Sequence, residues 1–142
     1  MRKIMLPIAA ILLMTQQAAA QDTKPGKVVR QEGQASFFEA GQDGNTRTKS
    51  GEPVDPQGYT AASRDLPLGT VATVTNQKTG KSVDVRINDR GPTRPDRIID
   101  VSEQAARELG MEEAGVALVV IEADPGKQQD PQVRSQLESA AQ

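Results

Sequence analysis

Three acidic residues occupy positions suited to proton transfer. Glu52 ends a short polar segment, Asp89 directly follows a run of alternating apolar and polar residues, and Asp100 directly precedes a helix-forming segment. Acidic side chains at strand ends and in loops project from the rim of a fold, where sites are commonly built. Because carboxyl groups exchange protons with substrate oxygens, this set indicates general acid–base chemistry.

Each acid also has a structural interpretation. Asp89 lies in the Asn-Asp-Arg-Gly-Pro segment 88–92, which is typical of a turn with a local ion pair. Asp100, near a helix start, can complement the helix dipole. Glu52 can be an ordinary loop acid. For Asp89 and Asp100 taken singly, the structural interpretation is the more common one.

Composition excludes most other catalytic chemistry. The chain has no Cys and no His, which excludes a disulfide framework, a Cys/His zinc site, a thiol nucleophile and any His-based triad. Gly41 and Gly44 fit neither a dinucleotide fingerprint nor a phosphate loop. Ser50 and Ser63 lack the Lys that would follow in a Ser–Lys dyad. We therefore expect neither a metal nor a cofactor.

The overall charge and the aromatic residues limit the partners. Lys and Arg number 17 against 19 Asp and Glu, a net charge of −2, which argues against nucleic acid as a partner. The aromatic residues are Phe37, Phe38 and Tyr59, so the core must be aliphatic. Adjacent residues on a strand point to opposite faces, so one of the two Phe rings is left to line a groove. We expect a monomer.

The first 20 residues have the pattern of a secretory signal peptide. Arg2 and Lys3 precede the uncharged apolar run Ile4–Met14, and Ala18–Ala20 supplies a small-residue cleavage site. The run is too short to cross a hydrocarbon layer of about 30 Å. Without Cys, the chain has no lipid-anchor residue. We expect an exported protein, periplasmic or secreted.

The remaining chain divides into three parts. We predict a polar linker over 21–32, one domain over 33–122 and a polar, disordered tail over 123–142. The tail holds at most a frayed helix over 133–141, which has too few apolar residues to pack. Strands are predicted over 34–38, 71–75, 83–88, 98–101 and 116–121, the last of them buried on both faces. A helix over 103–109 is predicted, capped by Ser102 and ended by Gly110. Short strands around one short helix favour a small, mainly β barrel.

Several ordered segments resemble the RlpA (rare lipoprotein A) family, and together they cover the central part of the chain. The matching segments are Gly33–Phe38, Thr48–Glu52, Tyr59–Ser63, Leu66–Thr70, Val74–Asn76, Asn88–Pro92, Arg97–Ser102 and Ala105–Met111. The resemblance implies a six-stranded double-psi β-barrel with one or two short helices, the fold shared with expansins and some membrane-bound lytic transglycosylases.

The resemblance also implies an activity. RlpA-like enzymes are lytic transglycosylases that cleave the β-1,4 bond between N-acetylmuramic acid and N-acetylglucosamine in peptidoglycan. They prefer glycan strands without stem peptides and leave 1,6-anhydro ends. The family's conserved acids fall on Glu52 and Asp89, and Asp100 matches an acid in the groove of expansin-like barrels. Ser36 and Thr48 match hydroxyl positions in the groove.

Two departures from the family pattern bear on catalysis. Ser63 stands where the family usually has His, and a hydroxyl cannot exchange a proton near neutral pH as imidazole does. Phe37 and Phe38 replace a common Trp-Tyr pair. We nevertheless count Ser63, Arg90 and Phe38 among the candidate substrate contacts, together with Ser36 and Thr48.

These residues lead to a mechanistic hypothesis with alternatives. Either Asp89 or Asp100 is the acid/base, the other lies close enough to raise its pKa, and Glu52 positions the sugar or stabilises charge. The competing hypothesis is a non-catalytic glycan-binding or expansin-like wall-loosening module, which the replacement of the family His by Ser63 favours. A purely structural interaction domain is the third alternative.

Overall fold

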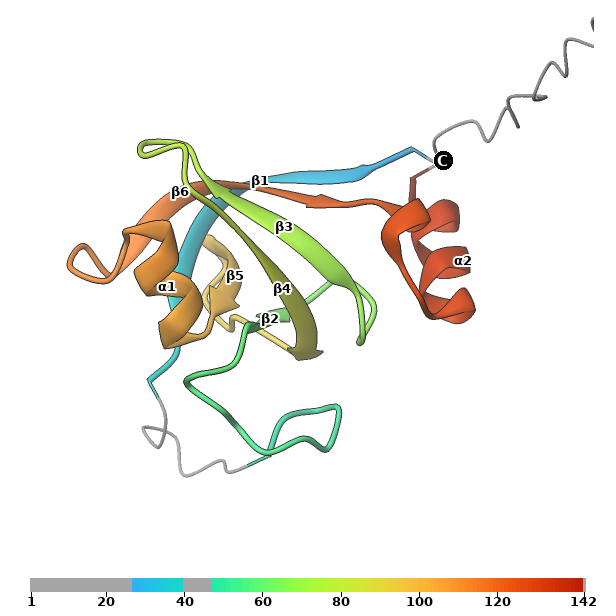
Figure 1. The fold of residues 1–142 in the computed structure, drawn as a ribbon, viewed down its shortest axis with the longest axis horizontal. Helices are drawn as coiled ribbons and strands as arrows, with labels where there is room; N and C mark the ends of the chain where they lie inside the picture. The colour runs from blue at the N-terminus through green and yellow to red at the C-terminus, as the bar shows by residue number, and fades with distance from the viewer. Residues whose placement is uncertain (1–26, 40–46, 142) are drawn as a thin grey trace, which may run out of the picture.

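The structure is a computed structural model, which describes residues 27–39 and 47–141. Within these residues six strands form a closed barrel in the order β1-β5-β2-β4-β3-β6, and two α-helices and a short 3-10 helix lie outside it (Figure 1). The elements are β1 (Val29–Phe37), β2 (Thr60–Ser63), β3 (Val71–Asn76), β4 (Ser82–Asp89), β5 (Arg97–Val101), α1 (Glu103–Leu109), β6 (Val116–Ala123), η1 (Pro125–Lys127) and α2 (Pro131–Ala140). The mainly β barrel with two short helices is as predicted.

Two parallel pairs give the barrel its topology. β1 pairs in parallel with β5, and β2 pairs in parallel with β4. The other four pairings are antiparallel, namely β1 with β6, β2 with β5, β3 with β4 and β3 with β6. The short strand β2, which the sequence patterns did not predict as a strand, therefore lies between β4 and β5.

Alternating aliphatic residues build the interior of the barrel. Val83, Val85 and Ile87 of β4 are buried, as the alternation predicted. The prediction that β6 is buried on both faces is wrong, because Val119 and Ile121 are buried whereas Leu118 is 57% exposed. A single barrel has one interior, and the outer face of β6 is only partly covered.

Helix α1 begins and ends where its capping residues predicted. The Ser102 hydroxyl accepts a hydrogen bond from the Ala105 amide at 3.2 Å, which satisfies one of the free N–H groups of the first turn. Gly110 ends the helix with φ of 69°, a left-handed conformation that favours glycine. The buried face of α1 packs Leu109 against the barrel.

The predicted polar tail is instead an ordered part of the structure. Asp130 caps α2, and Pro131 occupies its first turn. Helix α2 lies at one end of the barrel (Figure 1). Val133 and Leu137, four residues apart on one face of the helix, are both buried and belong to the hydrophobic core. The Gln128 side chain pairs with the backbone of Val71 as a neighbouring strand would. Its Oε1 accepts from the Val71 N–H at 2.8 Å, and its Nε2 donates to the Val71 carbonyl at 2.9 Å. These buried residues and the Gln128 amide attach the segment to the barrel.

At the other end of the chain, β1 extends into the segment predicted as a linker. Residues 29–32 pair with residues 120–123 of β6. The predicted signal peptide, residues 1–20, and residues 21–26 of the predicted linker lie outside the described residues. No helix within the described residues has the length and apolar character needed to cross a membrane.

Candidate active site

The position of β2 brings two of the predicted acids to one site. Ala62 of β2 pairs with Asp89 of β4 on one side and with Asp100 of β5 on the other. Residues paired across neighbouring strands point to the same face of a sheet. Asp89 and Asp100 therefore project to the same side, and two strand spacings place their Cα atoms about 10 Å apart.

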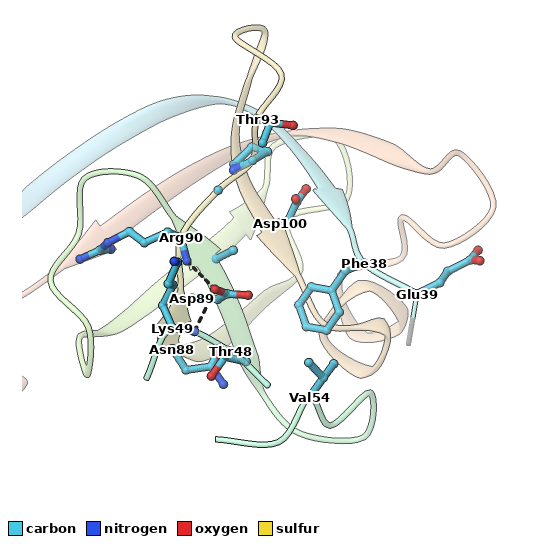
Figure 2. A pocket seen from close by; sticks show the side chains of 13 residues that line it. Phe38, Glu39, Thr48, Lys49, Val54, Asn88, Asp89, Arg90, Thr93 and Asp100 are labelled. Atoms are coloured by element: carbon cyan, nitrogen blue, oxygen red, sulfur yellow. Dashed lines mark hydrogen bonds between the residues drawn. The ribbon is translucent and has the colours of Figure 1, made fainter. Parts of the chain in front are cut away.

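A pocket of about 320 Å³ lies over this part of the barrel rim. Asp89 and Asp100 enter it from β4 and β5, the two strands that flank β2, and the Phe38 ring lies across from Asp89 (Figure 2). The other lining residues come from the end of β1, the segment before β2, β2 itself and the segment after β4; they are Glu39, Thr48, Lys49, Val54, Ala62, Asn88, Arg90, Gly91, Pro92 and Thr93. The pocket thus combines carboxylates, hydroxyls and one aromatic face.

Asp89 is held by backbone donors. Its Oδ1 accepts from the Lys49 N–H at 3.1 Å and from its neighbour Arg90's N–H at 2.9 Å. The other carboxylate oxygen points toward the pocket (Figure 2). Backbone N–H groups can only donate hydrogen bonds, and such donors complement the charge of an ionised carboxylate. This arrangement therefore suits Asp89 as an anion.

Asp100 is held by a hydroxyl. Ser36 lies opposite Asp100 in the parallel β1–β5 ladder, and its Oγ donates to Asp100 Oδ1. A hydroxyl can donate or accept, so Ser36 can serve Asp100 in either protonation state. The expectation that the two aspartates meet is wrong, because Ala62 separates them and each carboxylate has its own donors.

Glu52 lies beside the pocket rather than among its lining residues. Both of its carboxylate oxygens accept from the Arg86 guanidinium, one of them at 2.6 Å, and the Ser50 hydroxyl donates to the same carboxylate at 3.2 Å. The hydrogen bond from Arg86 is the main cause that lowers the pKa of Glu52. Glu52 is therefore ionised at neutral pH and is not a proton donor there.

Ser63 and Arg90, two of the predicted substrate contacts, make their side-chain hydrogen bonds within the fold. Ser63 is buried, and its Oγ accepts from the Asp65 and Leu66 amides at 3.3 and 3.0 Å. The Arg90 guanidinium donates to the carbonyls of Ser63 and Leu66 at 2.9 and 2.6 Å. Arg90 is one of the residues that line the pocket, but its side chain runs away from Asp89 and Asp100 (Figure 2).

The remaining predicted residues lie in or behind the pocket. Thr48 and Phe38 line it, and Ser36 stands behind Asp100. The lining residues that the sequence analysis did not name as site residues are Glu39, Lys49, Val54, Ala62, Asn88, Gly91, Pro92 and Thr93. Lys49 and Asn88 stand directly beside Thr48 and Asp89 in the matched segments, and that adjacency was the available signal.

A second, more open hollow lies around the exposed ring of Tyr59. It is lined by Tyr59, Ser82, Val83, Asp84 and Glu108 and has a volume of about 410 Å³. The Tyr59 hydroxyl donates to Glu108 Oε1 at 2.6 Å, and this hydrogen bond is the main cause that raises the pKa of Tyr59. Neither predicted aspartate lines this hollow.

Comparison with solved structures places the fold. The chain superposes on the Streptomyces papain inhibitor with a TM-score of 0.55 and 18% identity, over 72% of this chain and 99% of that one. A Clavibacter michiganensis expansin aligns with a TM-score of 0.52 and 27% identity, over 67% of this chain and 50% of that one. A variant of that expansin, solved in complex with cellohexaose, gives a TM-score of 0.53 and 25% identity over the same shares of the two chains. The fold is the double-psi β-barrel.

Sequence comparison identifies the family. A family model described as lytic transglycolase matches residues 30–121. The probable endolytic peptidoglycan transglycosylase RlpA of Treponema pallidum is 48% identical over 126 residues, which is 88% of this chain and 38% of that protein. The endolytic peptidoglycan transglycosylase RlpA of Neisseria meningitidis is 48% identical over 65% of this chain and 38% of that protein. The chain thus spans well under half the length of these relatives. It belongs to the RlpA-like lytic transglycosylase family.

Proposed function

We propose that this protein is a lytic transglycosylase of peptidoglycan. It cleaves the β-1,4 bond between N-acetylmuramic acid and N-acetylglucosamine in glycan strands without stem peptides and leaves 1,6-anhydro-N-acetylmuramic acid ends. The relatives are named endolytic peptidoglycan transglycosylases, which supports the substrate class and the type of reaction. The observation that supports it in this chain is the pair Asp89 and Asp100, which flank Ala62 and line one pocket.

Asp100 is the acid/base in this proposal. Its protonated carboxyl donates a proton to the glycosidic oxygen as the bond from that oxygen to muramic C1 breaks. The resulting carboxylate accepts the proton of the muramic C6 hydroxyl, whose oxygen bonds to C1 and closes the anhydro ring. Water is not consumed, and Asp100 ends the cycle protonated. Its partner Ser36 can accept or donate, so it serves both states.

Asp89 is the anion of the proposed mechanism. Positive charge develops at the sugar ring as the glycosidic bond breaks. A carboxylate held in place by the Lys49 and Arg90 amides stabilises that charge without having to reorient. Glu52 contributes indirectly in this proposal: its ion pair with Arg86 holds the segment that carries Lys49, whose N–H donates to Asp89.

This assignment does not need the family His. The Ser63 hydroxyl accepts two backbone hydrogen bonds and shapes the turn after β2. The proton path runs between Asp100 and the substrate alone. The function also requires access to the cell wall, and the signal-like residues 1–20 support the further proposal that the protein is exported to the periplasm or secreted.

The test is an incubation with purified glycan strands freed of stem peptides, followed by mass analysis of the products. Products one water lighter than hydrolysis products are expected from the wild-type protein. Asp100→Asn and Asp89→Asn should each lose activity by roughly 100-fold or more with an almost unchanged thermal midpoint. Asp65→Asn, an exposed acid outside the pocket, is the matched control.

Two results would count against the proposal. Binding of strands without any product would indicate a non-catalytic glycan-binding module. Full activity in both aspartate variants would show that the two pocket carboxylates take no part in catalysis.

A further inference from the structure

The two basic residues that line the pocket differ in whether their charged groups are bonded within the fold. Asp89, Asp100 and Glu39 supply carboxylates, and Lys49 and Arg90 are the basic residues that line the same space. The Arg90 guanidinium is committed to the carbonyls of Ser63 and Leu66. Within residues 27–39 and 47–141, the Lys49 ammonium has neither an ion-pair partner nor a hydrogen-bond partner. Lys49 is thus a pocket cation that the fold itself does not use.

The backbone of Lys49 is fixed even though its side chain is not. Its N–H donates to Asp89 Oδ1 at 3.1 Å. The residue before it, Thr48, donates its N–H to the Glu52 carbonyl at 2.8 Å, and the residue after it, Ser50, donates its N–H to the Asn88 carbonyl at 3.0 Å. The backbone of Lys49 is thus bonded to a carboxylate of the proposed mechanism, and its flexible ammonium, which has no partner in the described residues, is suited to binding an anionic group of the substrate.

The substrate carries one kind of anion near the bond to be broken. N-acetylglucosamine is neutral, whereas N-acetylmuramic acid bears a lactyl ether on O3. The lactyl carboxyl is a free anion when no stem peptide is attached and a neutral amide when one is. The Asp89 carboxylate, which is the anion of the proposed mechanism, repels that second anion unless a cation compensates.

We propose that Lys49 binds the free lactyl carboxylate of the muramic residue at the cleaved bond and thereby makes the enzyme select strands without stem peptides. This inference rests on the proposed function. A single charged contact at a solvent-exposed site gives a modest selectivity of roughly 10-fold, which corresponds to about 1.4 kcal/mol.

The experiment separates the charge of the lactyl group from its bulk. Three substrates are compared: strands with free lactyl carboxylates, the same strands with the carboxylates converted to methylamides, and strands that retain stem peptides. The wild-type protein should show a kcat/KM about 10-fold higher on the free carboxylates than on the methylamides. The difference should lie in KM, because the contact is made in both the bound substrate and the transition state.

The variants test the residue. Lys49→Met keeps the length of the side chain without its charge and should bring the ratio of the two kcat/KM values close to one. Lys49→Arg should retain most of the preference. Lys78→Met, an exposed lysine in the loop between β3 and β4, is the matched control and should behave like wild type.

The outcomes are distinguishable from failure of the proposed function. A Lys49→Met variant that keeps the full preference, or a wild-type protein that cleaves both denuded substrates equally, overturns the inference and leaves the function standing. If the wild-type protein cleaves nothing, the function fails. The inference is then decided by equilibrium binding of the same strands, where loss of the preference in Lys49→Met still supports it and retention overturns it.

Discussion

Ser36 and Asp100 are 64 residues apart in the chain, yet they lie opposite each other in the parallel β1–β5 ladder, and the Ser36 hydroxyl donates to the Asp100 carboxylate. Ser36 is buried, at 5% exposure, so the hydroxyl is held by the barrel rather than by solvent. The orientation of the proposed acid/base is therefore set by a residue of another strand.

Replacement of Ser36 by Ala should slow catalysis without unfolding the barrel. A hydrogen bond to a charged group contributes about 1.5–3 kcal/mol, so we expect kcat to fall roughly 10- to 100-fold. KM should change little, since Ser36 does not line the pocket. Steady-state kinetics on denuded strands measures the split.

Ser36→Thr keeps the hydroxyl and should restore most of kcat, whereas Ser135→Ala, at an exposed position on α2, should have no effect. Wild-type kcat in Ser36→Ala would contradict the positioning role.

Ala62 forms the floor between the two aspartates, and its small size keeps the pocket open. The residue is 6% exposed and lines the pocket. Ala62→Leu places a bulky side chain between Asp89 and Asp100, where a sugar ring would lie. Misplacement of the substrate by about 1 Å can cost roughly 100-fold in rate, and we expect kcat/KM to fall by that order.

Ala62→Ser, which is close to Ala in volume, should stay near wild type in the same assay. Equal activity of the Leu variant would show that the substrate does not occupy the space above β2.

The Glu52–Arg86 pair should stabilise the protein in a pH-dependent way. Arg86 lowers the pKa of Glu52 from its ordinary value of 4.5. A depressed folded-state pKa gives stability that is present above the unfolded value and is lost as pH falls through the folded value. Because both side chains are about two-fifths exposed, at 42% and 40%, we expect Glu52→Gln to cost only about 0.5–1 kcal/mol at neutral pH.

Chemical denaturation at neutral pH and again below the lowered pKa measures this loss, which should disappear in acid. Glu32→Gln, in the more exposed pair with Arg30, is the control and should change little at either pH. A loss that is equal at both pH values would show that packing, not charge, is responsible.

The local patterns predicted the elements but not their arrangement. Alternation in β4 and the caps Ser102 and Gly110 are signals within a few residues of one another, and the structure confirms both. β2 gave no such signal, because its four residues are all buried and small or polar. Its identity as a strand comes from pairing with β4 and β5.

The site shows the same limit. Their positions in the sequence, and then the resemblance, pointed to Asp89 and Asp100, but the insertion of Ala62 between them depends on the order of the strands. The contact between Glu52 and Arg86 joins residues that are 34 positions apart, and no local sequence pattern predicts it.

Helix α2 should contribute substantially to stability, contrary to the prediction of a disordered tail. Leu137 is fully buried, and a Leu→Ala change at a buried site costs about 2–5 kcal/mol. Leu137→Ala should therefore lower the free energy of unfolding by an amount in that range.

Denaturant titration measures the change. Gln136→Ala, one position earlier on the exposed side of the helix, should stay within about 0.5 kcal/mol of wild type. A Leu137→Ala variant as stable as the control would mean that α2 does not pack on the barrel in solution.

Tyr59 provides an optical measure of its contact with Glu108, because it is the single Tyr in a chain without Trp. Its hydroxyl donates to Glu108, and this hydrogen bond raises the pKa of Tyr59 above its ordinary value of 10.0. The contact therefore stabilises the fold below the unfolded-state pKa, and the stability is lost as pH rises through the folded-state value.

An absorbance titration of the phenolate should show a midpoint above the ordinary value in the wild-type protein. In Glu108→Gln the midpoint should fall, since the side chain no longer carries a charge that opposes ionisation, whereas Glu112→Gln, whose wild-type carboxylate pairs with Arg107, should leave it unchanged. An unchanged midpoint in Glu108→Gln would mean that the hydroxyl has another partner in solution and that the hollow beside Tyr59 is not ordered by Glu108.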